Sequence, residues 1–356
     1  MQTANTVTIG MDVSDRYCQI AVLDAGGTVV GTARVATELA GIRRWFGRYP
    51  ESRVVLEVGT HSPWLSRLLA EQGHEVIVAN PRKVALIHGS ETKNDRVDAE
   101  RLARLGRMDP SLLSPVVHRK AKTSEALRLL RARAALVKSR TQLVNTVRGM
   151  AKTEGNPLPK GSTASFHRNV ERLPEELLVS LEPLMQTIGM LTEKIAHYDR
   201  VVEDLAREVY PETEMLMEID GVGALTALCF VLTIEDPARF SSSRAVGSYL
   251  GLRPRQDQSG DVDKQLPITK AGDGLLRTYL VQAAHRILGP FGKDSDLRRW
   301  GLKLAERGGK AAKKRATVAV ARKLAVLMHH LWLTAQVYEP LHLAAQTTPA
   351  PLPATA

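Results

Sequence analysis

The sequence predicts a mixed α/β domain at the N-terminus, followed by a mostly helical remainder. Short β-prone runs alternate with helical patterns up to about residue 115. Charged helical patterns then take over, and an apolar seven-residue repeat occupies positions 177–209. We therefore expect an α/β domain at 1–115, a helical, coiled-coil region at 116–210, a mostly helical C-terminal domain at 211–345 and a disordered tail at 346–356.

Length and charge restrict the possible functions. A chain of 356 residues that is 44% hydrophobic is long enough for two or three domains with their own cores. Its 49 Lys and Arg against 38 Asp and Glu give a net charge of +11, which favours a polyanionic partner, with nucleic acid as the first choice. The two cysteines, Cys18 and Cys229, lie far apart in apolar contexts, so a disulfide framework or zinc cluster is not supported. Without a leader-like start or a membrane-length apolar run, we expect a cytoplasmic protein with no membrane partner.

The N-terminal elements follow from hydrophobic periodicity. Residues 6–12, 17–24 and 28–35 are β-prone runs joined by a polar turn and by "AGG", which predicts a three-stranded meander. A helical pattern follows, with four residues on one face: Leu39, Ile42, Trp45 and Phe46. The buried-type strand 53–57, a helix opened by Ser62 and Pro63, and the strand 74–80 complete the pattern before a last helix. The predicted order is β-β-β-α-β-α-β-α.

Two long helices are expected in the middle region. Residues 122–150 carry an apolar stripe surrounded by arginines and lysines, which suits a solvated face and contact with a nucleic-acid backbone about equally. After a loop rich in Gly, Pro and Ser, apolar residues from Leu177 to Val209 alternate spacings of four and three, and Pro183 is expected to distort the first turns. This seam pairs either with the 122–150 helix as an antiparallel hairpin or with another subunit as a coiled coil.

The C-terminal region contains two features that suit phosphate contact. "EIDGVGALTALCFV" has the spacing of a helix-hairpin-helix turn, in which Gly221 and Gly223 let backbone amides approach a phosphate, although a simple capping turn uses glycine too. A polar loop between helices is expected at 249–280, followed by a strongly basic run in which Glu306 is the one acid. So many like charges favour contact with a polyanion. The candidate nucleic-acid ligands are Gly221, Gly223, Arg253, Arg255, Lys270, Lys310, Lys313, Lys314 and Arg315.

Four acids stand at distinctive places in the α/β domain. Asp12 and Glu57 each end a strand, whereas Asp95 and Asp98 lie three residues apart at the start of the last helix. In that helix alone, dipole complementarity and an Asp98–Arg101 pair are the better explanation. The predicted order of elements, however, brings all four positions to one end of the sheet. Carboxylates without His or Cys suit Mg²⁺ or Mn²⁺ rather than zinc, and a pair of such ions suits phosphodiester chemistry.

This order and these acids resemble the RNase H-like fold, specifically the RuvC-like nuclease domain. The motifs "GMDVS", "LEVGT", "NDRVDAERLA", "IDGVG", "LGLRPRQDQSG" and "ITKAGDGLLR" together are similar to those of the DEDD-type insertion-sequence transposases of the IS110 family, which are related to the Piv invertases. The resemblance extends from about residue 6 to about residue 340. Two departures are local: Glu57 precedes Val58, Gly59 and Thr60 instead of a Thr-Gly pair, and Asp220 occupies a position often held by proline.

The resemblance implies a bacterial transposase, or site-specific DNA recombinase. Asp12, Glu57, Asp95 and Asp98 would bind Mg²⁺ or Mn²⁺, and motif matching puts a serine nucleophile at Ser259 in the C-terminal transposase domain. The implied partners are double-stranded donor and target DNA on the nucleoid and a structured bridge RNA that guides the enzyme. The resemblance also implies a homo-dimer or tetramer with active sites assembled across subunits.

Two other function classes remain open. A hydrolytic, junction-resolving endonuclease would use the same four acids with water as the nucleophile and would not need Ser259. A non-catalytic nucleic-acid-binding descendant is disfavoured, because four clustered acids without a metal ion would be a liability.

Overall fold

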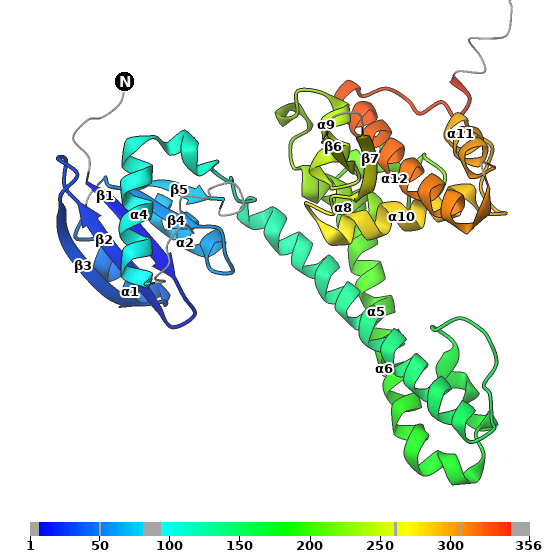
Figure 1. The fold of residues 1–356 in the computed structure, drawn as a ribbon. Helices are drawn as coiled ribbons and strands as arrows, with labels where there is room; N and C mark the ends of the chain where they lie inside the picture. The colour runs from blue at the N-terminus through cyan, green and yellow to red at the C-terminus, as the bar shows by residue number, and fades with distance from the viewer. Residues whose placement is uncertain (1–6, 50, 81–93, 260–261, 307, 343–356) are drawn as a thin grey trace, which may run out of the picture. The chain divides into compact units, whose positions relative to one another are not determined.

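The computed structural model describes residues 7–49, 51–80, 94–259, 262–306 and 308–342. The predicted tail at 346–356 therefore lies outside the described residues. The chain forms two compact units, residues 1–120 and 121–356, and each is described by itself (Figure 1). No described helix is both long and apolar enough to cross a membrane.

The first unit contains the predicted order of strands and helices. Its elements are β1 (Thr8–Val13), β2 (Tyr17–Leu23), β3 (Val29–Ala36), α1 (Leu39–Phe46), β4 (Arg53–Glu57), α2 (Ser62–Glu71), β5 (Glu75–Ala79), α4 (Asp95–Met108) and the 3₁₀ helix η1 (Pro110–Leu113). The strands form one sheet in the order β3-β2-β1-β4-β5, with β1, β4 and β5 parallel and the β1–β2–β3 meander antiparallel. The prediction of a mixed α/β N-terminal domain is confirmed.

Helices cover both faces of this sheet (Figure 1). Apolar residues of α1 and α2, including Phe46 and Leu65, pack with Ile9, Met11 and Leu56 on one face. On the other face, α4 packs its buried leucines against strands β4 and β5. Leu39 stands at the first position of α1 and is 63% exposed, because the core contacts of α1 begin one turn later, at Ile42.

The second unit is mostly helical. Its elements are α5 (Ala121–Thr153), η2 (Phe166–Arg172), α6 (Glu175–Glu208), α7 (Glu212–Met217), α8 (Ala224–Ile234), η3 (Pro237–Arg239), α9 (Ser243–Tyr249), β6 (Pro254–Ser259), β7 (Val262–Ile268), α10 (Gly274–Leu288), α11 (Asp296–Ala305) and α12 (Gly309–Thr334). Helix α8 lies at the centre of the core, where every residue from Thr226 to Ile234 is buried. Helices α10 and α12 supply most of the other core residues.

Helices α5 and α6 pair as an antiparallel hairpin within the chain (Figure 1). At one end Leu127 and Leu130 join Val202 of α6 in the C-terminal core. At the other end Val147 packs with Met185 and their neighbours in a separate apolar cluster. The intramolecular alternative is therefore the pairing seen in this chain, and α6 runs unbroken through Pro183. A coiled coil between subunits stays a prediction.

The expectation of an irregular loop at 249–280 was wrong in its centre. Strands β6 and β7 form an antiparallel two-stranded sheet, and the backbone of Ser259 pairs with Val262. The polar sequence of β6, "PRQDQS", has low β-propensity, which concealed the strand. The short Gly-containing stretch between the two strands was the signal that could have revealed a hairpin.

Candidate functional site

Asp12 and Glu57 occupy neighbouring places at one edge of the first sheet. Asp12 is the second-last residue of β1 and Glu57 is the last residue of β4, and the register of these adjacent parallel strands pairs Met11 with Leu56 one residue earlier. Met11 and Leu56 belong to the core beneath α1 and α2. Because side chains alternate along a strand, the next residue of each strand points to the opposite face, the face covered by α4. Both carboxylates are half-buried there.

Helix α4 runs antiparallel to β1, which brings its first turn to the same edge. Gly10 in β1 faces the α4 backbone: a β-carbon at this position would overlap the carbonyl oxygen of Ala99 and the amide nitrogen of Ala103. The C-terminal half of α4 contacts the β2–β3 turn at the opposite edge, where Arg104 Nη1 donates to the carbonyl of Gly27 (3.3 Å). Asp95 and Asp98, in the first turn of α4, therefore lie toward the strand ends that carry Asp12 and Glu57.

The two α4 acids differ in their surroundings. Asp95 is exposed, whereas the Asp98 side chain is 22% exposed and lies 3.6 Å from Nη1 of Arg101. Asn94 caps the helix by accepting a hydrogen bond from the amide of Arg96 (3.1 Å). Across the described part of the chain, no three His, Cys, Asp or Glu side chains lie close enough together to hold one metal ion. The four acids share an edge of the sheet, and a metal ion bound by them stays a prediction.

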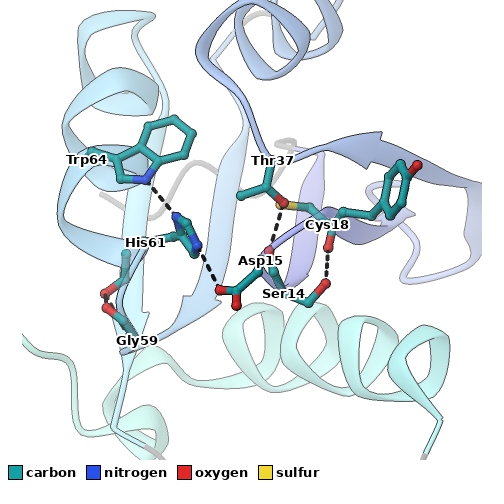
Figure 2. Close-up of polar contacts among 9 residues, drawn as sticks. Ser14, Asp15, Cys18, Thr37, Gly59, His61 and Trp64 are labelled. Atoms are coloured by element: carbon teal, nitrogen blue, oxygen red, sulfur yellow. Dashed lines mark hydrogen bonds and ion pairs between the residues drawn. The ribbon is translucent and has the colours of Figure 1, made fainter.

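A chain of hydrogen bonds links the two loops next to this edge (Figure 2). His61, in the loop after β4, lies between Asp15 in the loop after β1 and Trp64 in α2 (Figure 2). Its Nδ1 accepts from the indole N–H of Trp64 at 3.1 Å, and its Nε2 is 3.2 Å from Oδ1 of Asp15. Because the indole only donates, Nε2 carries the proton and donates to the carboxylate. Sequence reasoning missed this link, since 46 positions separate its two loops.

A second set of contacts fixes the turn from β1 to β2 (Figure 2). The hydroxyl of Thr37 donates to the carbonyl of Ser14 at 2.8 Å and lies 3.3 Å from the sulfur of Cys18. Burial raises the pKa of the Cys18 thiol, and the nearby Asp12 carboxylate raises it further. A thiol of this kind is protonated and unreactive at neutral pH, so Cys18 has a packing role beside Asp12.

The second unit holds Ser259 at the end of β6. The structure describes its backbone pairing with Val262, while Gly260 and Asp261 fall among the residues outside the described ranges. Arg253 and Arg255, at the start of the hairpin, are exposed. Lys270 follows β7 with a left-handed backbone (φ 55°), and its amide donates to the carbonyl of Gly251 at 3.1 Å.

The two glycines of the turn before α8 have different roles. Gly221 has φ +87°, and a β-carbon there would lie 3.0 Å from the carbonyl oxygen of Ala283 in α10. Left-handed backbone and close packing therefore account for Gly221. Gly223 caps α8, and a β-carbon at its position would meet no described atom within 4 Å. Of the two, Gly223 is the one that leaves room for a ligand at the helix N-terminus.

Exposed cations concentrate at the start of α12. This helix begins at Gly309, and its first turns carry four exposed cations: Lys310, Lys313, Lys314 and Arg315. Positive charges near a helix N-terminus oppose the helix dipole. The arrangement is unfavourable for the isolated chain and is compensated if an anion binds there.

Both units match known transposases. Residues 9–153 match the family model for DEDD transposases of the IS110 type, and residues 213–295 match the model described as "Transposase IS116/IS110/IS902 family". The transposase for insertion sequence element IS1111A of Coxiella burnetii is 29% identical over 339 residues, covering 93% of this chain and 90% of that protein. The transposase for IS1328 of Yersinia enterocolitica is 27% identical, covering 79% of this chain and 83% of that protein.

A recombinase that inverts DNA is also among the relatives. The pilin gene-inverting protein of Moraxella bovis is 26% identical over 291 residues, covering 78% of both chains. The two family models leave unmatched mainly the second half of the α5–α6 hairpin and the last helices. From these matches in both units, we conclude that the chain belongs to the IS110 family of DEDD transposases.

Proposed function

We propose that this transposase cleaves and rejoins DNA strands through Ser259, with a divalent metal ion held by Asp12, Glu57, Asp95 and Asp98. The observation that carries the proposal is the common edge formed by the ends of β1 and β4 and the first turn of α4. The strand order β3-β2-β1-β4-β5 supports an RNase H-like, RuvC-like assignment for this unit.

The donor set fits Mg²⁺ or Mn²⁺, since all four side chains offer carboxylate oxygens and no histidine or cysteine belongs to the set. When bound, the ion would polarise a phosphodiester and stabilise the oxygen that leaves it. Since no three of the described acids lie within reach of one ion, an ion held by all four would require these side chains to move closer together. The Asp15–His61 hydrogen bond supports the site by tying together the loops that follow Asp12 and Glu57.

Serine chemistry distinguishes recombination from hydrolysis. Attack by Ser259 Oγ on a phosphodiester forms an O–P bond and breaks the bond to one deoxyribose oxygen, which leaves as a free hydroxyl once it takes up the serine proton. The product is a phosphoserine that links the protein to DNA and keeps the energy of the broken bond. A DNA hydroxyl then attacks the phosphoserine and regenerates Ser259, so strands are rejoined without an external energy source.

The partners proposed for this reaction are donor DNA, target DNA and a structured guide RNA, bound by a dimer or tetramer. The net charge of +11 and the exposed lysines on α12 support nucleic-acid partners. The similarity to pilin gene-inverting proteins favours recombination over simple hydrolysis. We place the reaction in the bacterial cytoplasm, at the nucleoid.

The test compares wild type, Ser259→Ala and Asp12→Asn with labelled DNA substrate on denaturing gels, with and without chelator. We expect wild type to form a covalent protein–DNA adduct and recombinant product, and each variant to lose both while still binding DNA. Chelator should also abolish the wild-type reaction. Recombination by Ser259→Ala would refute the serine mechanism and leave the hydrolytic nuclease as the better assignment. Activity that survives both chelator and Asp12→Asn would refute the metal site.

A further inference from the structure

A pocket in the second unit carries four cations, and of these only Arg253 is among the nucleic-acid ligands predicted from the sequence. It has a volume of about 650 Å³ and is enclosed by α9, the residue before β6, α11 and α12. We call it the Trp300 pocket. Its described lining residues are Arg244, Ser248, Arg253, Trp300, Arg322, Lys323 and Val326.

The charge of this pocket is unbalanced. Arg244, Arg253, Arg322 and Lys323 are all exposed, and no acid is among the described residues that line it. Four cations converging on one hollow repel one another, so the arrangement costs stability until an anion occupies it. By contrast, Arg131, Arg133 and Arg299 of the same unit each have an acidic partner. The contrast points to an anionic ligand.

The shape and lining indicate more than a bare phosphate. A volume of 650 Å³ is in the range of pockets that hold small organic ligands. The indole of Trp300 and the side chain of Val326 provide apolar surface beside the guanidinium groups. A nucleotide has the matching combination of a flat apolar base and an anionic phosphate, and in a duplex that base would be stacked out of reach.

The pocket is only partly arranged before binding. Lys323 holds its ammonium 4.5 Å above the centre of the Trp300 ring, so a base stacks on this face once the ammonium moves from the ring to the phosphate. Gly247 in α9 makes room for Arg322: a β-carbon at this position would lie 2.9 Å from Arg322 Cγ. Arg253 immediately precedes β6, so the pocket stands at the base of the hairpin whose first strand ends at Ser259.

We propose that the Trp300 pocket binds one unpaired nucleotide of a single-stranded nucleic acid, with the phosphate on the arginines and the base against Trp300. This inference rests on the proposed nucleic-acid partners. It extends that proposal by naming a binding site and by specifying that the bound strand is unpaired. DNA and RNA strands share this chemistry. Whichever strand it is, the pocket would hold it at the base of the serine hairpin.

Binding of the full chain to a labelled 30-nucleotide single strand, as DNA and as RNA, and to the same sequence as duplex DNA tests the proposal. For Arg322→Gln and Lys323→Gln we expect about fivefold weaker single-strand binding at 0.15 M salt, and a salt slope shallower by about 0.7 for each cation removed.

For Trp300→Leu we expect at least about fivefold weaker single-strand binding with an unchanged salt slope, because stacking rather than charge is lost. Gly247→Ala displaces Arg322 without changing the charge and should also weaken binding. The strand type that suffers the larger loss, DNA or RNA, identifies the natural source.

Arg200→Gln is the matched control, since it removes an exposed cation from α6, outside the pocket. It should leave single-strand affinity within twofold of wild type. Thermal midpoints should be unchanged, or higher where a repelling cation is removed. Equal losses in Arg200→Gln and Lys323→Gln would show a general charge effect and overturn the proposal, as would equal losses on duplex and single strand for Trp300→Leu. Neither result depends on Ser259, so failure of the pocket and failure of the serine mechanism are separable.

Discussion

Gly10 in β1 lies directly beneath Ala99 in α4, so close that a β-carbon at residue 10 would overlap the Ala99 carbonyl oxygen. This contact positions the helix that carries Asp95 and Asp98 against the strand that carries Asp12. Glycine is required here because two backbones meet, and the residue's φ is not in the left-handed region. The placement of the proposed catalytic acids therefore depends on the absence of one methyl group.

Gly10→Ala should destabilise the protein and displace α4. We expect a loss of about 1–3 kcal/mol in the free energy of unfolding, the usual cost of overpacking, and loss of DNA cleavage. Urea unfolding of the full chain followed by circular dichroism measures the first effect. Gly59→Ala is the control, since a β-carbon there would meet nothing within 4 Å, and it should stay within about 0.5 kcal/mol of wild type. Equal stability of the two variants would contradict the close contact.

Replacing Arg140 by methionine should stabilise the α5–α6 hairpin. Arg140 is 8% exposed in α5, and burial lowers its pKa. Its Nη1 donates to Thr192 Oγ1 at 3.2 Å, but its Nε has no partner in the described structure. Exchanging a poorly paired buried charge for an apolar side chain of similar length typically gains about 1–4 kcal/mol.

Denaturant unfolding of Arg140→Met and of the exposed control Lys138→Met measures this gain. The control should change stability by less than about 0.5 kcal/mol. A less stable Arg140→Met would mean that Arg140 is better satisfied than these contacts indicate.

The N-terminal sheet could be predicted from sequence because its strands and helices keep their hydrophobic periods. Strands β1 and β4 are short runs of buried, mostly apolar residues that include Met11 and Leu56, so both strands were recognisable. The β6–β7 hairpin was missed because the residues of β6 are polar and have low β-propensity. The exposure of Leu39 could not be predicted, because periodicity does not reveal where a helix first touches the core.

The candidate site, like the fold, could be predicted from the sequence only in part. Asp12 and Glu57 could be recognised as acids that end apolar strands, and the sheet register places them side by side. The Asp15–His61 link depends on two loops meeting in space, which no local pattern encodes. Ser259 has no local signal either, and its assignment rests on the family motif alone. The sequence left two partners open for the α6 repeat, the α5 helix and another subunit. Contacts within the chain show the pairing with α5.

Acid should weaken the first unit through His74. This residue is 6% exposed; its Nδ1 accepts from the amide of Ser52 at 3.3 Å, and burial lowers its pKa below the usual value of 6.5. The unfolded chain therefore takes up the proton more readily, so stability is full above pH 6.5 and is lost as the pH falls from 6.5 through the folded-state pKa.

Unfolding free energies of wild type and His74→Asn between pH 7.5 and 5 test this dependence. Asparagine keeps an acceptor for the Ser52 amide and does not titrate, so its stability should fall less with acid. Part of the dependence should remain, because burial and Arg67 also lower the pKa of His118. Identical slopes for the two proteins would exclude His74 as a source.

The hydrogen bond between His61 and Asp15 should matter for catalysis far more than for stability. The Asp15 side chain is 95% exposed, and such a surface pair contributes only about 0–1 kcal/mol. It nevertheless joins the loops that follow Asp12 and Glu57, whose spacing the proposed metal site requires. A displacement of about 1 Å of catalytic groups can cost on the order of 10²-fold in rate.

We expect His61→Ala and Asp15→Ala each to slow strand cleavage by roughly 10- to 100-fold. Because both remove one link, the double variant should be no slower than the worse single variant. His197→Ala, which removes an exposed histidine from α6, should cleave like wild type. If the fold-losses of the two single variants multiplied in the double variant, the two residues would act independently. The His61–Asp15 hydrogen bond would then not set the spacing of the acids.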